Sequence, residues 1–182
     1  MFTGVATVGI PKESKQDEDR VAIAPSGVHH LADRGHRVLI EKGAGRGSGI
    51  PDAEFRHAGA VIADTAAEVY AQSDVVAKVK EPLAAEYPLI RRGQVLFTFF
   101  HFAASRELTV AMIESGATCV AYETILDRQG RLPILTPMSE VAGRMSVIEG
   151  AKYLERPFGG RGVLISGVPG VEPAKVVILG GG

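Results

Sequence analysis

Three side chains of different chemistry follow predicted strands in this sequence. Arg20 lies in the polar stretch after the first strand, Lys80 follows the strand at residues 74–79, and His101 follows the strand at residues 95–100. A guanidinium binds a carboxylate through two parallel hydrogen bonds, an ammonium stabilises a carbonyl oxygen, and an imidazole moves a proton near neutral pH. Together these groups indicate a pocket for a small 2-oxo or 2-amino acid.

Each of these residues also has a purely structural interpretation. Arg20 stands among acidic residues and is compatible with a solvated surface ion pair. Lys78 and Lys80 share one face of a regular strand, so we expect only one of them to be functional. His101 is flanked by phenylalanines, which is also typical of a histidine packed in the core.

The elements that must position these residues alternate regularly between strands and helices. Strands separated by single helices need crossover connections, which predicts a parallel sheet with helices on both faces. The fold class is therefore a doubly wound α/β domain, flavodoxin-like or Rossmann-like, whose ligands bind beyond the carboxyl ends of the strands. Strands are predicted at residues 5–10, 38–41, 60–63, 74–79, 95–100 and 118–122, and helices at 26–34, 52–58, 65–72, 84–91 and 105–115.

The pattern changes after Gly130. Thr136 and Pro137 are typical of a helix start, and a long helix is predicted to about residue 155. Its apolar residues Val141, Met145 and Ile148 have helical spacing, which predicts one buried stripe. We interpret this helix as a connector, with a domain at residues 1–136 and a second region at 137–182; a core helix of one single domain is the alternative.

The last residues resemble the opening of a dinucleotide site. Residues 175–179 are predicted to form a strand, and Gly180, Gly181 and Gly182 follow it. In a Gly-x-Gly turn the first glycine permits the tight turn and the second lets the backbone approach the pyrophosphate. This predicts the start of a Rossmann NAD-binding domain, with a flexible glycine tail as the alternative.

Composition excludes several classes of partner. The 20 lysines and arginines nearly balance the 21 aspartates and glutamates, so neither nucleic acid nor an anionic membrane is an expected partner. No apolar run is long enough to span a bilayer. The single cysteine, Cys119, is interpreted as a core residue and fits a reducing cytoplasm. The other histidines show no metal-ligand spacing, so no metal is expected.

An ordered string of motifs runs from residue 9 to 182 and closely resembles bacterial alanine dehydrogenase, whose family includes the transhydrogenase alpha subunit. The resemblance implies NAD-dependent, reversible oxidative deamination of L-alanine to pyruvate and ammonia by a cytoplasmic homo-oligomer, usually a hexamer. Family members are about twice as long, which implies that this chain is an N-terminal portion, inactive alone. The motifs are GIPKE, RVA, GAG, KVKEP, AYET, PMSEVAG and GVPGV.

The resemblance also implies roles for individual residues. Arg20 and Lys80 would hold the substrate carboxylate and carbonyl, and His101 would be the catalytic or substrate-orienting imidazole. With Lys80, His101 forms the expected catalytic pair. The implied cofactor contacts are Ser139, Gly180 and Gly182.

Two other functions remain open at this point. The nucleotide-binding subunit of proton-translocating transhydrogenase has the same layout, but we expect that relative to lack Lys80 within KVKEP and to lack His101. A non-catalytic α/β binding module is the second alternative.

Overall fold

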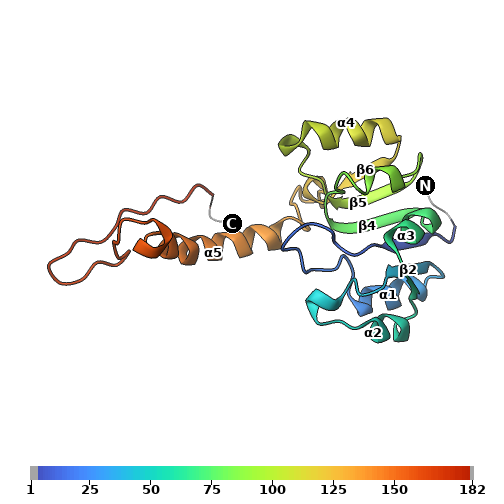
Figure 1. Cartoon of the computed structure of the whole chain (residues 1–182), viewed down its shortest axis with the longest axis horizontal. Helices are drawn as coiled ribbons and strands as arrows, with labels where there is room; N and C mark the ends of the chain where they lie inside the picture. The colour runs from blue at the N-terminus through green and yellow to red at the C-terminus, as the bar shows by residue number, and fades with distance from the viewer. Residues whose placement is uncertain (1–3, 181–182) are drawn as a thin grey trace. The chain divides into compact units, whose positions relative to one another are not determined.

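The computed structural model describes residues 4–180, which divide into two compact units, residues 4–124 and 125–180. The first unit is built on a six-stranded sheet in which every pair of neighbouring strands is parallel. The parallel α/β fold predicted from the sequence is therefore confirmed (Figure 1). The strands are β1 Thr7–Ile10, β2 Arg37–Glu41, β3 Val61–Ala63, β4 Val75–Lys80, β5 Val95–Phe99 and β6 Thr118–Ala121.

The strand order is β3-β2-β1-β4-β5-β6, the order of Rossmann folds. The chain moves outward from β1 to β3, then returns to the other side of β1 and moves outward again to β6. Successive connections therefore leave a crevice beyond the carboxyl ends of β1 and β4, where ligands of open parallel sheets bind. Val8 and Gly9 of β1 pair with Val75 and Val76 of β4 across this switch point.

Helices cover both faces of the sheet. On one face, α1 (Pro25–Ala32) and α2 (Asp52–His57) bury Val28 and Phe55 against a core that includes Val38 and Ile40 of β2. Leu39, between them, faces the other side because side chains alternate along a strand. There it joins Val69 of α3 (Ala66–Gln72), and α4 (Arg106–Ser115) completes that layer beside β5 and β6.

Local sequence signals explain where the covering helices start and stop. The hydroxyls of Thr65 and Ser105 accept hydrogen bonds from backbone N–H groups in the first turns of α3 and α4. Gly116 ends α4 with a φ of 67°, a left-handed conformation that glycine adopts without strain. These caps fix the lengths of the helices that support the sheet.

The prediction of a helix at residues 84–91 was wrong. Only a short 3-10 turn forms there, η2 (Tyr87–Leu89). Pro88 has no N–H to donate within a helix, and the carboxylate of Glu86 accepts the backbone N–H of Leu83 instead. The segment is a folded loop held by the Glu86 side chain.

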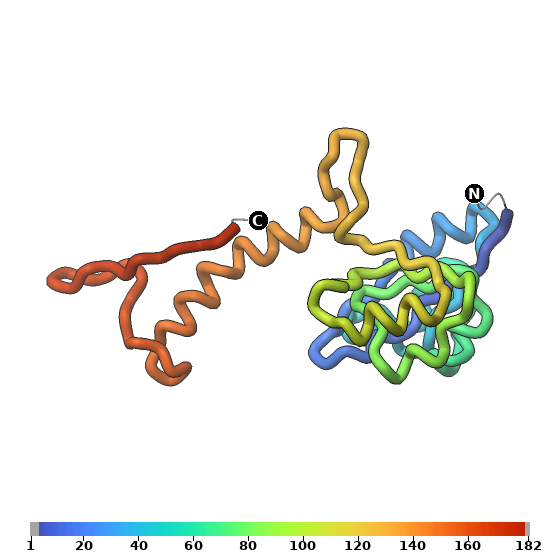
Figure 2. Tube along the Cα trace, turned by 90° about the horizontal axis from the view of Figure 1, so that it is seen from above, coloured from blue at the N-terminus to red at the C-terminus, as the bar shows by residue number. Residues whose placement is uncertain are grey.

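The second unit contains α5 (Thr136–Tyr153) and irregular chain that returns along it (Figure 2). The strand predicted at residues 175–179 does not form, because a strand needs a hydrogen-bonded neighbour and residues 125–180 supply none there. The buried stripe predicted on α5 was also wrong: Val141, Met145 and Ile148 are all exposed. The domain boundary at residue 136 stays a prediction, and Gly182 lies outside the described residues.

Candidate functional site

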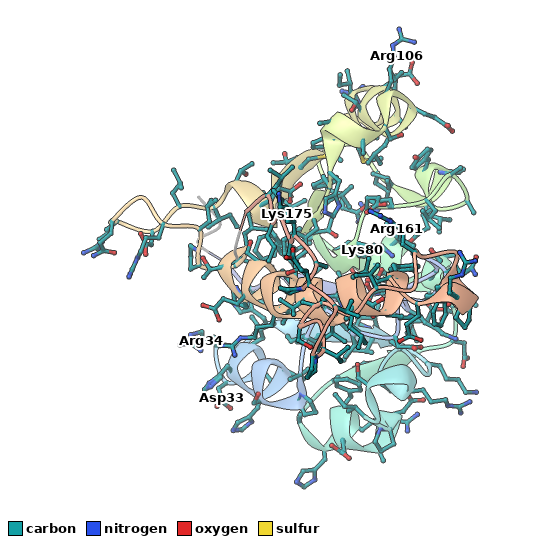
Figure 3. All side chains as sticks on the ribbon, turned by 90° about the vertical axis from the view of Figure 1, so that its left-hand side faces the viewer. Asp33, Arg34, Lys80, Arg106, Arg161 and Lys175 are labelled. Carbon is teal, nitrogen blue, oxygen red and sulfur yellow. The ribbon has the colours of Figure 1, made fainter. Side chains whose placement is uncertain are left out.

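The side chains of Arg20, Lys80 and His101 lie on loops or strand ends at one edge of the sheet. Arg20 belongs to the loop between β1 and α1, Lys80 is the last residue of β4, and His101 lies two residues beyond the end of β5. Because β1, β4 and β5 are neighbours and parallel, all three follow carboxyl ends on the same side of the switch point. Lys80 is labelled in Figure 3, which also shows the side chain of Arg106 on α4 pointing outward.

Arg20 is held by an acidic neighbour in its own loop. Its Nε donates to Glu18 Oε1 at 2.7 Å and its Nη2 to Glu18 Oε2 at 2.6 Å. The Arg20 side chain is 45% exposed, but the Glu18 side chain only 8%. Hydrogen bonds from Arg20 hold the pKa of Glu18 below its ordinary value, and the charge of Lys80 acts in the same direction. Both cations therefore act electrostatically on one carboxylate.

The two lysines of β4 have different surroundings. Lys78 is buried, whereas Lys80 at the strand end is half-buried. The register between β4 and β5 shifts between Ala77 and Lys80, so the regular alternation assumed from the sequence is interrupted there. Of the two, Lys80 is the one whose position allows contact with a ligand.

Lys78 of β4 belongs to a polar cluster that is buried in the first unit. Its Nζ lies 3.0 Å from Glu86 Oε1 and 3.4 Å from Glu13 Oε2, although neither oxygen completes an aligned hydrogen bond. The Tyr70 and Ser14 hydroxyls donate to Glu86 at 3.1 and 2.9 Å. This cluster ties β4 to the β1 loop and to α3.

Glu13 connects the cluster to the backbone of β4. Its carboxylate accepts the N–H of Val79 at 2.6 Å and that of Lys80 at 3.3 Å. Burial raises the pKa of Glu13, while the charge of Lys78 and these N–H groups oppose the increase. Glu13 therefore fixes the backbone from which the Lys80 side chain projects.

His101 adopts a left-handed backbone conformation, with a φ of 51°. Such a conformation is uncommon for a non-glycine residue and persists where its surroundings hold it. Here the carboxylate of Glu123 accepts the N–H of His101 at 2.7 Å and that of Phe100 at 3.1 Å. Glu123 lies in η4 (Tyr122–Thr124), directly after β6, so a neighbouring strand end shapes the turn that carries His101.

The ring of His101 faces a second carboxylate. Its Nδ1 lies 3.4 Å from Glu81 Oε2, and the other oxygen of Glu81 accepts a hydrogen bond from Lys15. Burial opposes ionisation of Glu81, but the hydrogen bond from Lys15, a backbone N–H, the charge of Lys15 and the contact with His101 together outweigh it and hold its pKa below the ordinary value. Glu81 therefore joins the loops that follow β1 and β5.

A small cavity lies beside His101. Its volume is about 210 Å³, and Glu81, Tyr87, Phe100 and Ser105 are among the residues that line it with His101. Neither Arg20 nor Lys80 lines this cavity. A single pocket shared by Arg20, Lys80 and His101 therefore stays a prediction.

A larger groove of about 670 Å³ lies within the second unit. Ser139 in the first turn of α5 lines it together with Gly180, whose φ is 82°. A hydroxyl near a helix start and a glycine that leaves the backbone accessible suit one edge of an anion-binding site. Ser139 and Gly180 therefore fit the edge of a dinucleotide site, for which Gly182 was the third predicted residue.

The sequence did not predict the carboxylates that position Lys80 and His101. Glu13 and Glu123 accept hydrogen bonds from the backbone at these two residues, and Glu81 faces the ring of His101. Two signals existed: Glu81 stands directly between Lys80 and Pro82, and Glu123 directly follows the predicted strand at 118–122.

Other kinds of site find no support in the described part of the chain. Within residues 4–180, no cluster of histidine, cysteine, aspartate and glutamate side chains could hold a metal ion. Among the same residues, no helix is both long enough and apolar enough to cross a membrane.

Two family models match the sequence. The model described as "Alanine dehydrogenase/PNT, N-terminal domain" matches residues 9–142, and the corresponding C-terminal domain model matches residues 146–182. The chain belongs to the alanine dehydrogenase/PNT family. The resemblance stated from the motifs is thereby confirmed.

Alanine dehydrogenases are among the most similar proteins. That of Mycobacterium tuberculosis (strain ATCC 25618 / H37Rv) is 58% identical over 175 residues, which cover 96% of this chain and 47% of the relative. That of Bacillus subtilis (strain 168) is 52% identical over 176 residues, covering 96% of this chain and 46% of the relative. The chain thus spans about half the length of the curated alanine dehydrogenases that it matches.

Solved structures of the alanine dehydrogenase/PNT family have the same fold. An L-alanine dehydrogenase matches with a TM-score of 0.80 and 52% identity, covering 97% of this chain and 48% of that one. A transhydrogenase from Sinorhizobium meliloti matches with a TM-score of 0.71 and 36% identity, covering 80% of this chain and 44% of that one. Both branches of the family therefore share this architecture.

Proposed function

We propose that the protein to which this chain corresponds oxidises L-alanine with NAD⁺ and water to pyruvate, ammonium, NADH and a proton, and catalyses the reverse reaction. The observation that carries the proposal is the arrangement of Arg20, Lys80 and His101 at the ends of adjacent parallel strands. Similarity to curated alanine dehydrogenases supports the choice of substrate.

The proposed substrate contacts follow from the chemistry of the side chains. The guanidinium of Arg20 would bind the substrate carboxylate with two parallel N–H donors, and Lys80 Nζ would donate to the oxygen of the pyruvate carbonyl. Because Glu18 accepts from Nε and Nη2 of Arg20, the substrate carboxylate would either use other N–H donors of the guanidinium or displace Glu18.

His101 would handle the proton. Its imidazole would accept a proton from the water that attacks the oxidised substrate carbon, and would return it in the reverse direction. Histidine suits this step because its charge changes near neutral pH.

The cofactor belongs to the same proposal. NAD⁺, when bound, would supply hydride acceptance, and Ser139, Gly180 and Gly182 would contact it near the pyrophosphate. Membership of the alanine dehydrogenase/PNT family also favours a cytoplasmic homo-oligomer, expected to be a hexamer. The proposal includes no metal, nucleic-acid or membrane partner.

Transhydrogenase activity is the second candidate, favoured by the 36% identity to the Sinorhizobium meliloti transhydrogenase structure. Lys80 and His101 argue for amino-acid chemistry instead, because hydride exchange between two nucleotides needs neither a carbonyl-binding ammonium nor an acid–base imidazole. Assaying both reactions on the same protein separates the candidates.

The test is NADH formation by the full-length protein with L-alanine and NAD⁺ at alkaline pH. We expect activity in the full-length protein and none in the 182-residue chain alone, because the chain spans about half the length of the curated alanine dehydrogenases that it matches. NADH formation from the short chain would refute the second expectation, and inactive full-length protein would refute the proposal.

The role of His101 is tested in the same assay. We expect His101→Ala to lower kcat by a factor of about 10² to 10⁴, as for loss of general acid–base help. His57→Ala, at the end of α2, is the matched control and is expected to retain activity. A change of less than about threefold for His101→Ala would return His101 to a packing role.

A further inference from the structure

Glu81 is placed to control the ring of His101. It follows Lys80 at the carboxyl end of β4, and its side chain is 17% exposed, whereas that of His101 is 48% exposed. The Nδ1 of His101 lies 3.4 Å from Glu81 Oε2, and both residues line the cavity of about 210 Å³. Their contact therefore lies inside the part of the site that a ligand can reach.

Neither partner in this contact is free to move independently. The other oxygen of Glu81 holds the ammonium of Lys15 from the loop between β1 and α1. The backbone N–H of His101 is held by Glu123, and its ring lies near Phe99, with centroids 6.0 Å apart and ring planes 23° apart. The Glu81 carboxylate and the backbone that carries the imidazole are thus both held by contacts of their own.

The protonation states follow from donor and acceptor chemistry. The hydrogen bond and the charge of Lys15 favour the ionised form of Glu81, and an ionised carboxylate only accepts hydrogen bonds. Nδ1 of His101 must therefore be the donor. In the neutral ring the lone pair then lies on Nε2, because only one of the two nitrogens carries a proton.

We propose that Glu81 is a positioning residue: its carboxylate accepts a hydrogen bond from Nδ1–H of His101, and leaves Nε2 as the nitrogen that accepts the proton of the attacking water. Lys15 holds Glu81 in this orientation and links the arrangement to the loop that carries Arg20. The substrate part of this inference rests on the proposed function. The tautomer part does not.

The test is the tautomer of His101 in the 182-residue chain, read from multiple-bond ¹H–¹⁵N spectra at a pH where the imidazole is neutral. His101→Asn assigns its signals among the five histidines. We expect the Nδ1–H form in the unmodified chain. In Glu81→Ala, its share is expected to fall at least about twofold, because the acceptor is lost. Glu81→Gln keeps an acceptor oxygen and is expected to restore part of it.

Glu107→Ala is the matched control, because Glu107 lines the same cavity without a hydrogen bond to His101. We expect no change of tautomer in this variant. A predominant Nε2–H form in the unmodified chain would overturn the proposal, as would equal tautomer populations in the unmodified chain and Glu81→Ala. The readout needs neither alanine nor NAD⁺, so its failure is distinct from failure of the proposed function.

Discussion

At the scale of single residues, a carboxylate accompanies each of the three side chains proposed to bind the substrate. Glu18 binds the Arg20 side chain, Glu13 holds the backbone at Lys80, and Glu81 faces the ring of His101. Sequence patterns identified the three side chains because their types suit a small acid. The sequence did allow an ion pair between Arg20 and a nearby acidic residue, and Glu18, two residues away, forms it. The contacts of Glu13 and Glu81 were not predicted, because they join segments far apart along the chain.

The buried cluster predicts a large effect on stability. Replacing Lys78 by alanine leaves Glu13 and Glu86 buried without their cation, which should lower the free energy of unfolding by about 3–5 kcal/mol. Urea unfolding of the 182-residue chain measures this. Lys42→Ala is the control, because Lys42 pairs with Asp64 at 3.9 Å on the surface, and is expected to change the free energy by less than about 1 kcal/mol. Similar small effects for both variants would contradict the stabilising role of Lys78 in the buried cluster.

The pair formed by Arg20 and Glu18 predicts a pH dependence. Because the pKa of Glu18 is lowered by folding, its contribution to stability is present above its unfolded value of 4.5 and is lost as pH falls through the folded pKa. Glu18→Gln should therefore destabilise the chain at pH 7 by less than about 1 kcal/mol, since Arg20 is partly exposed. The difference from the unmodified chain should shrink in acid. Urea unfolding from neutral pH to below pH 4.5 measures this difference, and a constant difference would contradict the assignment.

At the scale of elements, hydrophobic patterns predicted all six strands of the sheet and four of its helices to within a few residues. Apolar β-branched runs and capping residues carry that information locally. The helix predicted at 84–91 failed because a local pattern did not reveal that Glu86 turns inward to Lys78 and Leu83. The strand order could not be predicted from the sequence either, since alternating elements predict parallel strands but not which strands become neighbours.

The packing of α3 on β1 predicts a site that tolerates only glycine. A Cβ added at Gly9 would lie 2.1 Å from Ser73 Oγ and 2.7 Å from Val69 Cγ1. Gly9→Ala should therefore lower the free energy of unfolding by about 1–3 kcal/mol through overpacking. Gly4→Ala, whose added methyl meets nothing within 4 Å, is the control and should stay within about 0.5 kcal/mol. Equal stabilities of the two variants in urea unfolding would show that α3 can move away.

At the scale of the whole molecule, the second unit marks the limit of prediction from local sequence. Residues 175–179 have the composition of a strand, and α5 carries an apolar stripe, yet neither is paired or buried within residues 125–180. Strand pairing and burial depend on other parts of a fold. The match of residues 146–182 to a C-terminal domain model explains why these patterns are present in the sequence.

The central claim is that Arg20, Lys80 and His101 bind one small acid. A crystal structure of the full-length protein with pyruvate tests it most directly. We predict one pyruvate whose carboxylate pairs with Arg20, whose carbonyl oxygen accepts from Lys80, and whose reacting carbon lies next to His101. Pyruvate bound elsewhere, or contacted by only one of the three side chains, would contradict the account.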